Sequence, residues 1–492
     1  MLVIISDLHL TDGTSGELID EKAFRIFRNR ISDMAYDASW RIRGGRSGRD
    51  GFGGDGAGAG AGDKAGEGGK PAGFYQPLEQ LDILLLGDII DMIRSEKWNG
   101  QPEINMPWTS ARSDAFFAQI AEIVAGVLEN NKKSFAILKD IAQAGIKIPV
   151  SMRILTEEEK ISRTIGSEAS PEKATVKVNV YYMVGNHDWF LYIDDPRMNA
   201  IRNSIIDALG LANERDKPFP YFPDENAALE RSQTDHHVYA LHGDIFDKTN
   251  YQPPSRDHSS IGDVVVLKLL NEIPNQIEQQ LSDFPADRIG AIAGIDLFVK
   301  ELREIDNLRP YTLAPQWISD LIKKYGLDVA FVNDSIRGAL QKLLRDFAKN
   351  PLISKEHLLV LEMKITGLLL KGDVTIESLA SLVEHLSLSK DNFESYRAYA
   401  RTLTTNEAGK DKTFYVMGHT HYPEIVPMSS CVVDGEVVGQ IYMNTGTWRP
   451  LHKTGIYDNS FISLNTMTIA GFYKGNERMG HSFEYWTGSL DL

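Results

Sequence analysis

Five short apolar runs in this sequence each end in residues that could bind a metal ion. The polar clusters that follow them are Asp7-Leu8-His9, Gly87-Asp88, Gly185-Asn186-His187-Asp188, His242-Gly243-Asp244 and Gly418-His419-Thr420-His421. Carboxylates and imidazoles together suit divalent Mn, Fe or Zn. A lone histidine is more often a core residue than a ligand. Histidines repeated at several predicted strand ends, beside two aspartates and an asparagine, instead favour a metal site.

The first three clusters offer distinct ligand chemistry. Asp7 and His9 are alternate residues, and alternate residues face the same side of an extended chain. The carboxylate of Asp88 has two oxygens and could bridge two cations. Alternatively, Asp88 could be the N-cap of a helix over residues 89–94. Asn186 offers a neutral amide oxygen to a cation.

Strands and helices must hold these clusters in place. Apolar strands that finish in polar loops are typical of a buried sheet whose strand ends carry a site. The predicted strands cover residues 2–6, 83–86, 176–184, 238–241 and 414–417. Apolar residues at helical spacing predict amphipathic helices over 117–128, after Ser113, and over 329–347.

The C-terminal region predicts further strands. Val432-Val433, Asp434-Gly435 and Val437-Val438 have the pattern of a β-hairpin. Strands over 461–464 and 469–473 are predicted to complete a second sheet.

Two insertions interrupt this pattern. Residues 44–73 are dominated by Gly, Ala, Asp and Lys, which bury too little apolar surface to order a segment, so a disordered surface loop is predicted. Residues 251–410 are mostly helical in pattern and separate the last two clusters, which predicts a helical cap or lid over the site. The catalytic domain would then comprise residues 1–250 and 411–492.

Composition narrows the class of protein and its partners. The chain has 492 residues, 42% of them hydrophobic, enough for a sizeable core. Its formal net charge of −16 disfavours duplex nucleic acid and anionic membranes. A small phosphorylated substrate stays compatible, because bound cations reverse the local field. Cys431 is the single cysteine, which fits a reducing compartment, and we expect neither a signal peptide nor a transmembrane segment. The sequence predicts a cytoplasmic protein and leaves its oligomeric state open.

The ordered set DLH, GDIID, GNHD, HGD and GHTH resembles the calcineurin-like metallophosphoesterase superfamily over residues 7–421. The resemblance implies an α/β fold, a four-layer α/β/β/α sandwich, here with a large helical cap insertion. It also implies one metal ion held by Asp7, His9 and His421, a second held by Asn186, His242 and His419, and Asp88 bridging the two.

Such a centre predicts hydrolysis of a phosphomonoester or phosphodiester. Two divalent ions roughly 3.5–4 Å apart bind the phosphate and share a hydroxide made nucleophilic by its lowered pKa. By the resemblance, His187 acts on the phosphate as an acid or transition-state stabiliser and Asp91 orients it. We expect two Mn²⁺ ions, with Fe or Zn as alternatives, and a small nucleotide-like substrate.

Three other interpretations of the site are open. The SDLHL opening and the helical insertion also resemble UDP-diacylglucosamine pyrophosphohydrolases, although that branch commonly has Arg in place of His187 and a shorter lid. A nuclease of the double-strand-break repair type shares the DxH, GNHD and GHxH patterns but needs a basic track. A binding scaffold could keep the fold without the chemistry.

Residues beside the clusters have simpler interpretations. Trp189 and Phe190 are predicted to pack beneath their loop, and His236 and His237 to be surface or loop residues. Arg449 could contact a substrate phosphate or form a surface salt bridge.

Overall fold

The chain adopts a mixed α/β fold in the computed structural model, which confirms the predicted class. The structure describes residues 1–16, 19–42, 73–109, 111–151, 172–282, 292–308, 313–353, 375, 393–406, 409–433, 436–458 and 460–490. Of the predicted loop 44–73, residues 44–72 lie outside this description. Gly73 begins strand β3 (Gly73–Tyr75), which pairs with β2 (Trp40–Ile42).

The larger sheet contains six strands in the order β14-β13-β1-β4-β6-β5. Their bounds are β1 (Leu2–Ile5), β4 (Gln80–Leu86), β5 (Ile146–Pro149), β6 (Lys173–Met183), β13 (Thr466–Phe472) and β14 (Phe483–Ser489). Strands β1, β4 and β6 run parallel, whereas β13 is antiparallel to β1 and β5 is antiparallel to β6. The three central strands therefore send their carboxyl ends to the same edge.

The smaller sheet contains four strands in the order β7-β8-β10-β9. Their bounds are β7 (Val238–Ala240), β8 (Phe414–Met417), β9 (Pro423–Val433) and β10 (Glu436–Thr445). Strand β7 runs parallel to β8, and β9 pairs antiparallel with β10 as the predicted hairpin. The strands that precede all five polar clusters are thus confirmed, but they are divided between two sheets.

One prediction about the C-terminal strands is wrong. Strand β13 does not join the second sheet but pairs with β1 in the larger one, and β12 (Phe461–Leu464) pairs with β11 (Leu451–Thr454) in a separate hairpin. Residues 467–472 of β13 are buried on both sides of the strand, as a place inside a covered sheet requires. Strand β12, by contrast, is largely exposed.

The two sheets pack face to face through alternate residues of their strands. Leu2 and Ile4 of β1 and Leu84 of β4 share a buried cluster with Phe414 and Val416 of β8. Because side chains alternate along a strand, the residues between these face outward. The sheets are therefore joined by a continuous apolar layer.

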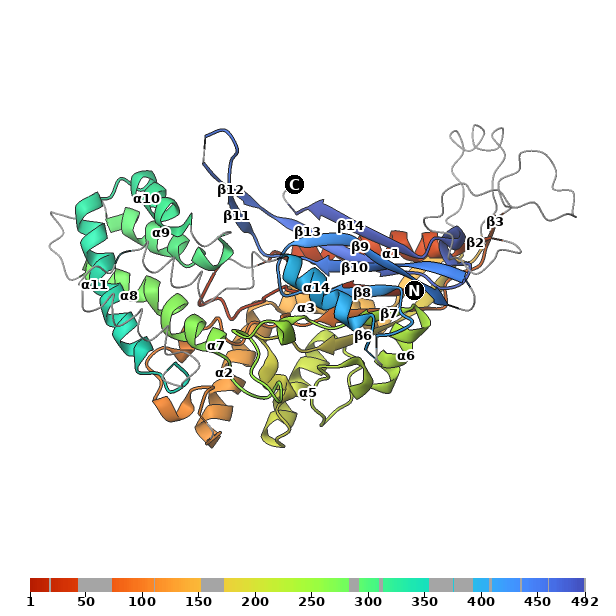
Figure 1. The fold of residues 1–492 in the computed structure, drawn as a ribbon, viewed down its shortest axis with the longest axis horizontal. Helices are drawn as coiled ribbons and strands as arrows, with labels where there is room; N and C mark the ends of the chain where they lie inside the picture. Colours follow the sequence, from red (N-terminus) through yellow and green to blue (C-terminus); the bar gives the residue numbers. More distant parts are fainter. Residues whose placement is uncertain are drawn as a thin grey trace, which may run out of the picture.

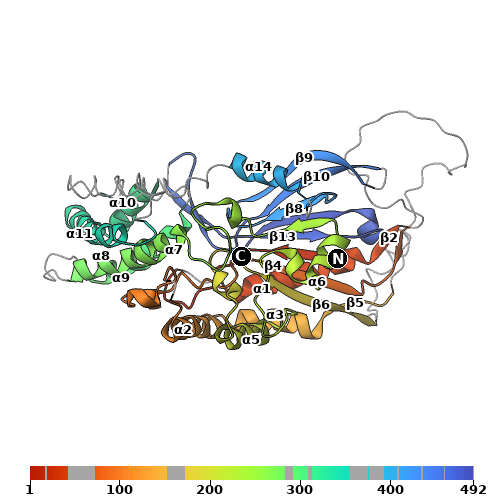
Figure 2. The ribbon, with the colours of Figure 1, turned by 60° about the horizontal axis from the view of Figure 1, so that its bottom comes forward.

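Helices cover the outward faces of both sheets (Figures 1 and 2). On the larger sheet lie α1 (Glu21–Ala38), α2 (Asp114–Asn130), α3 (Lys132–Ala144) and α5 (Arg197–Leu209). Helix α6 (Ala227–Asp235) adjoins β7, and α14 (Phe393–Leu403) packs on the smaller sheet against Tyr415 and Tyr442. Helix α2 begins after Ser113, as predicted, because the Ser113 hydroxyl accepts a hydrogen bond from Phe116 N at 3.1 Å.

The insertion 251–410 is helical wherever it forms regular structure in its described part. Its helices α7 to α11 gather at one end of the molecule, beyond the sheets (Figure 1). Their bounds are α7 (Ile261–Val265), α8 (Glu272–Ser282), α9 (Ile292–Leu302), α10 (Ala314–Lys324) and α11 (Val329–Ala348). Helix α11 matches the predicted helix over 329–347. Within the described ranges, no helix combines the length and the apolar character needed to cross a bilayer.

We expect the layer between the sheets to be a main source of stability. Leu84 is fully buried in it, so Leu84→Ala should lower the free energy of unfolding by about 2–5 kcal/mol through lost burial and a cavity. Leu297 on α9 is 49% exposed, and Leu297→Ala should change the free energy by about 0.5 kcal/mol or less. Urea denaturation midpoints measure both effects, and equal losses would contradict a packed interface.

Candidate metal centre

The loops that follow β1, β4, β6, β7 and β8 meet at one edge of the paired sheets. They bring together the predicted catalytic residue His187 and all seven of the predicted ligands, namely Asp7, His9, Asp88, Asn186, His242, His419 and His421. Contacts of 2.7 to 3.8 Å join them into one connected set. What each residue binds stays a prediction; their convergence is observed.

Five of these residues have a left-handed backbone. The φ angles are +53° at Asp7, +48° at His9, +54° at Asp88, +68° at His419 and +64° at His421. Such angles are uncommon for residues other than glycine and cost free energy that the surrounding structure must supply. Five such residues at one site indicate that the surrounding structure, and not local conformational preference, fixes the backbone there.

The observed backbone corrects one local prediction and excludes one alternative. Asp7 and His9 do approach one another, but through two left-handed residues and not through the alternation of an extended chain. Residues 89–94 form no helix, so Asp88 is not an N-cap. The loop is fixed instead by sheet-like bonds from Asp7 N to Gly87 O at 3.1 Å and from His9 N to Asp88 O at 2.8 Å.

The first ligand group consists of Asp7, His9 and His421. The Nε2 atoms of the two histidines lie 3.0 Å apart, and Asp7 Oδ1 lies 3.5 Å from His421 Nε2 and 3.8 Å from His9 Nε2. Two imidazole nitrogens and a carboxylate oxygen thus point at the same small volume.

The second group consists of Asp88, His242 and His419, with Asn186 beside them. His242 Nε2 lies 3.2 Å from Asp88 Oδ2 and 3.2 Å from Asn186 Oδ1. Asn186 Oδ1 in turn lies 2.8 Å from His419 Nδ1. His242 Nδ1 donates to the Leu86 carbonyl at 2.9 Å, which leaves Nε2 as the nitrogen that faces the group.

These spacings fit a divalent cation. Ligand atoms about 2.1 Å from an ion and about 90–109° apart lie about 3.0–3.4 Å from one another, close to the distances seen in both groups. Asp88 also groups with His9 and His187, so its carboxylate lies between the two sets. The donor set of nitrogen and oxygen atoms could hold a metal ion, and it suits Mn, Fe or Zn alike.

Asp91 orients two of the histidines at once. Its Oδ2 accepts from His9 Nδ1 and its Oδ1 from His187 Nδ1, both at 2.9 Å. The backbone N–H of Arg94 also donates to Oδ1 at 2.9 Å. A carboxylate on Nδ1 fixes the tautomer and the ring orientation of a histidine, so it leaves Nε2 of each ring for another partner.

Glycine is required where the loops cross. A Cβ on Gly185 would overlap Asp88 Oδ1 and would approach His242 Cδ2 to 2.8 Å. A Cβ on Gly418 would likewise overlap Asp7 Oδ2. The glycines of the GNHD and GHTH patterns therefore make room for ligand side chains.

The electrostatics of the centre are dominated by buried opposite charges. Burial alone would raise the pKa of Asp88, but the neighbouring His242 and His187 hold it well below its usual value. Burial would lower the pKa of His9, but hydrogen bonds to Asp7 and Asp91 raise it to about 9. In the absence of a cation the His9 imidazole thus binds a proton beside the carboxylates, and a divalent cation can replace that proton.

Two contributors were missed as functional residues by sequence reasoning. The Asp188 carboxylate accepts hydrogen bonds from Gly185 N at 2.6 Å and Ile89 N at 3.0 Å, and so ties two loops together. The buried Asp247 Oδ2 lies 3.2 Å from His419 Nε2. Asp188 belongs to the GNHD pattern and could have been found there, whereas no spacing singles out Asp247.

The predictions for residues beside the ligand clusters are only partly confirmed. Trp189 and Phe190 are fully buried, which confirms that they pack beneath the loop. His236 and His237 form the turn between α6 and β7, which confirms that they are loop residues, but His236 is not on the surface: it is buried and its Nδ1 contacts the Ser232 carbonyl at 2.7 Å. Arg449 does form an ion pair, 2.9 Å from Asp306, but only 3% of its surface is exposed, so the pair is not on the surface.

Comparison with known proteins adds no assignment. Neither the protein-family models nor the curated proteins contain a match to this chain.

Substitution of one glycine should test the centre without removing a ligand. Gly185→Ala should weaken Mn²⁺ binding at least tenfold, because the added methyl group overlaps Asp88 Oδ1. Gly439 on β10 has open space around its Cβ position, so Gly439→Ala should leave Mn²⁺ binding unchanged. Metal content by mass spectrometry and Mn²⁺ titration provide the measurement; wild-type affinity in the Gly185 variant would contradict this geometry.

Proposed function

We propose that this protein is a metal-dependent phosphoester hydrolase of the calcineurin-like metallophosphoesterase type. The observation that carries the proposal is the position of the Asp88 carboxylate between two groups of ligand atoms. A carboxylate shared between two sets of donors is what a dinuclear centre needs. The alignment of this geometry with the DLH, GDIID, GNHD, HGD and GHTH patterns supports it further.

In this proposal the ligands divide into two sets around Asp88. One divalent ion is assigned to Asp7, His9 and His421, and the other to Asn186, His242 and His419. When bound, the two ions neutralise the charge of a phosphate group and activate water as a nucleophile. The ions are proposed to be Mn²⁺, and Fe or Zn would also suit the donors.

The role proposed for the chain itself centres on His187. Its backbone N–H donates to Asp88 Oδ1 at 2.7 Å, and its ring donates to Asp91 through Nδ1. These two bonds hold Nε2 of His187 at the border of the centre. The side chain of His187 is 12% exposed to solvent there. In its doubly protonated form, an imidazole so placed can donate the Nε2 proton to the leaving oxygen of a phosphoester while Nδ1–H stays bonded to Asp91.

The same proposal extends to the fold and its domains. Two sheets that pack face to face, with helices on both outward faces, are consistent with the four-layer α/β/β/α sandwich. Residues 1–250 and 411–492 would form the catalytic domain, and 251–410 the helical cap. Helix α14, inside the latter range, packs on the smaller sheet, so the cap would return to the catalytic domain before residue 393.

The proposed substrate is a small phosphorylated compound, nucleotide-like, as a monoester or a diester. The excess of acidic residues disfavours a nuclease, which would need a basic track. A pyrophosphohydrolase of sugar nucleotides is the second candidate, supported by the helical insertion beside the centre. A binding scaffold is disfavoured because none of the predicted ligands is missing from the site.

Hydrolysis assays decide between these functions. Mn²⁺-loaded protein should hydrolyse bis(4-nitrophenyl) phosphate or 4-nitrophenyl phosphate, and chelation of the metal should abolish turnover. A panel of nucleotides, cyclic nucleotides and sugar nucleotides would then rank substrates. Metal-free protein without turnover would support the scaffold, and cleavage of DNA in preference to small diesters would support the nuclease.

A histidine substitution tests the proposed proton donor. His187→Ala should lower kcat by about 10²–10⁴-fold, the usual contribution of a general acid, while metal content stays at the wild-type level. His258 is a surface histidine with 55% of its side chain exposed, and His258→Ala should leave kcat unchanged. Wild-type turnover by a fully metallated His187→Ala enzyme would remove His187 from the catalytic role.

A further inference from the structure

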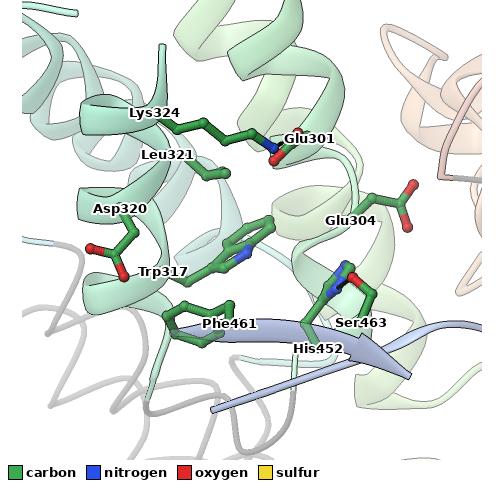
Figure 3. Close-up of a pocket in the computed structure, with 9 residues that line it drawn as sticks. All are labelled: Glu301, Glu304, Trp317, Asp320, Leu321, Lys324, His452, Phe461 and Ser463. Atoms are coloured by element: carbon green, nitrogen blue, oxygen red, sulfur yellow. Dashed lines mark hydrogen bonds and ion pairs between the residues drawn. The ribbon is translucent and has the colours of Figure 1, made fainter. Parts of the chain in front are cut away.

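The cavity between α10 and the β11–β12 hairpin satisfies its own charges (Figure 3). Its volume of about 410 Å³ is in the range of small-molecule sites. The three carboxylates in its described lining, those of Glu301, Glu304 and Asp320, all have partners in neighbouring side chains. A wall whose charges are already paired does not select a charged ligand.

Inside the metal centre, His419 is turned the opposite way from the other ligand histidines. Those present Nε2 to the centre, namely His9, His242 and His421. In His419 it is Nδ1 that lies beside another ligand, 2.8 Å from Asn186 Oδ1. Its Nε2 lies instead 3.2 Å from Asp247 Oδ2.

The Asp247 carboxylate is fixed in place behind His419. It is 1% exposed, and its Oδ1 accepts a hydrogen bond from Thr249 N at 2.9 Å. Its Oδ2 accepts a hydrogen bond from Asn250 Nδ2 at 2.8 Å. Asn250 in turn packs against the backbone of Gly262 in α7, where a Cβ would overlap Asn250 Oδ1. The carboxylate thus has a fixed position against which the imidazole is oriented.

A carboxylate beside Nε2 selects one tautomer of His419. An ionised carboxylate only accepts hydrogen bonds, so in the neutral ring the proton lies on Nε2 and the lone pair on Nδ1. A half-turn of the ring would place carbon atoms against Asp247 and Asn186, and both polar contacts would be lost. Asp247 therefore fixes the tautomer and the orientation of the ring together.

The contact between His419 and Asn186 fits a shared cation. With the proton on Nε2, Nδ1 of His419 and Oδ1 of Asn186 are both acceptors, yet they lie 2.8 Å apart. A divalent ion bound to both atoms would satisfy them, because ligand atoms about 2.1 Å from an ion and about 90° apart lie about 3.0 Å from one another.

We propose that Asp247 is a positioning residue that makes Nδ1 of His419 the metal-binding nitrogen of the second ligand group. This inference rests on the proposed function of the centre and adds the residue that selects one of its ligand atoms. Asp247 is also bonded to Asn250, directly before the insertion 251–410. The root of the insertion and a ligand of the second ion therefore share one carboxylate.

NMR of the metal-free protein with ¹⁵N-labelled histidine tests the tautomer directly. At alkaline pH the neutral His419 ring of the wild type should carry its proton on Nε2. In Asp247→Asn the side-chain amide can donate to Nε2, so the proton should move to Nδ1. A His419→Gln sample assigns the signals, and the measurement does not depend on bound metal.

Titration with Mn²⁺ measures the consequence for the second ligand group. The wild type should bind two ions per chain. Asp247→Asn should retain one and bind the other about 10–100-fold more weakly, the usual effect of removing the partner of a metal-bound histidine. Asp257, which pairs with Arg112 and His258, provides the matched control. Asp257→Asn removes the same charge and should bind both ions as the wild type does, and thermal melting should show both variants folded.

Three results would overturn the positioning role of Asp247. They are a wild-type His419 with its proton on Nδ1, an unchanged tautomer or unchanged Mn²⁺ affinity in Asp247→Asn, and equal losses of affinity in the two variants. If Asp247→Asn does not fold, the tautomer of the wild type decides alone. Wild-type protein that binds no Mn²⁺ would overturn the proposed function itself.

Discussion

The buried charge of Asp88 is the constraint on which the rest of the centre depends. Its side chain is 1% exposed, and an unpaired carboxylate in such a place would cost several kcal/mol. Three groups from three other loops stabilise this carboxylate: the side chains of His242 and His9, and the backbone N–H of His187. Because these partners lie far apart in the sequence, the charge is stabilised only when both sheets are assembled.

The left-handed backbone of five residues likewise depends on the assembly of both sheets. Strain of about 1–3 kcal/mol at a residue persists only when the surroundings fix it, and here five such residues follow strands of the two sheets. Two features provide the fixation. The inter-sheet core around Leu84 sets the distance between the strand ends, and the bonds of Asp188 join the GDIID loop to the GNHD loop. The stability of the core is thereby used to hold ligand side chains in one place.

Sequence reasoning was most successful where local chemistry decides the outcome. The strands that precede the polar clusters, helix α2 after Ser113 and the β9–β10 hairpin all follow from periodicity and turn residues. Sequence reasoning failed where contacts between residues far apart in the sequence decide the structure. Nothing local to β13 says that it inserts beside β1, since the partner is more than four hundred residues away. The burial of Arg449 likewise depends on Asp306, which a different part of the chain supplies.

The contacts of Asp306 also limit how the insertion 251–410 could move. Asp306 pairs with Arg449 at 2.9 Å and lies 3.7 Å from Arg94, while Arg94 donates to Asn271 of the insertion at 3.0 Å. The backbone of Arg94 is in turn bonded to Asp91, which orients two histidines of the centre. A swing of the insertion about this root would break buried ionic hydrogen bonds and disturb Asp91 at the same time. The root of the insertion is therefore held to the loop that carries Asp91 by a continuous set of buried polar contacts.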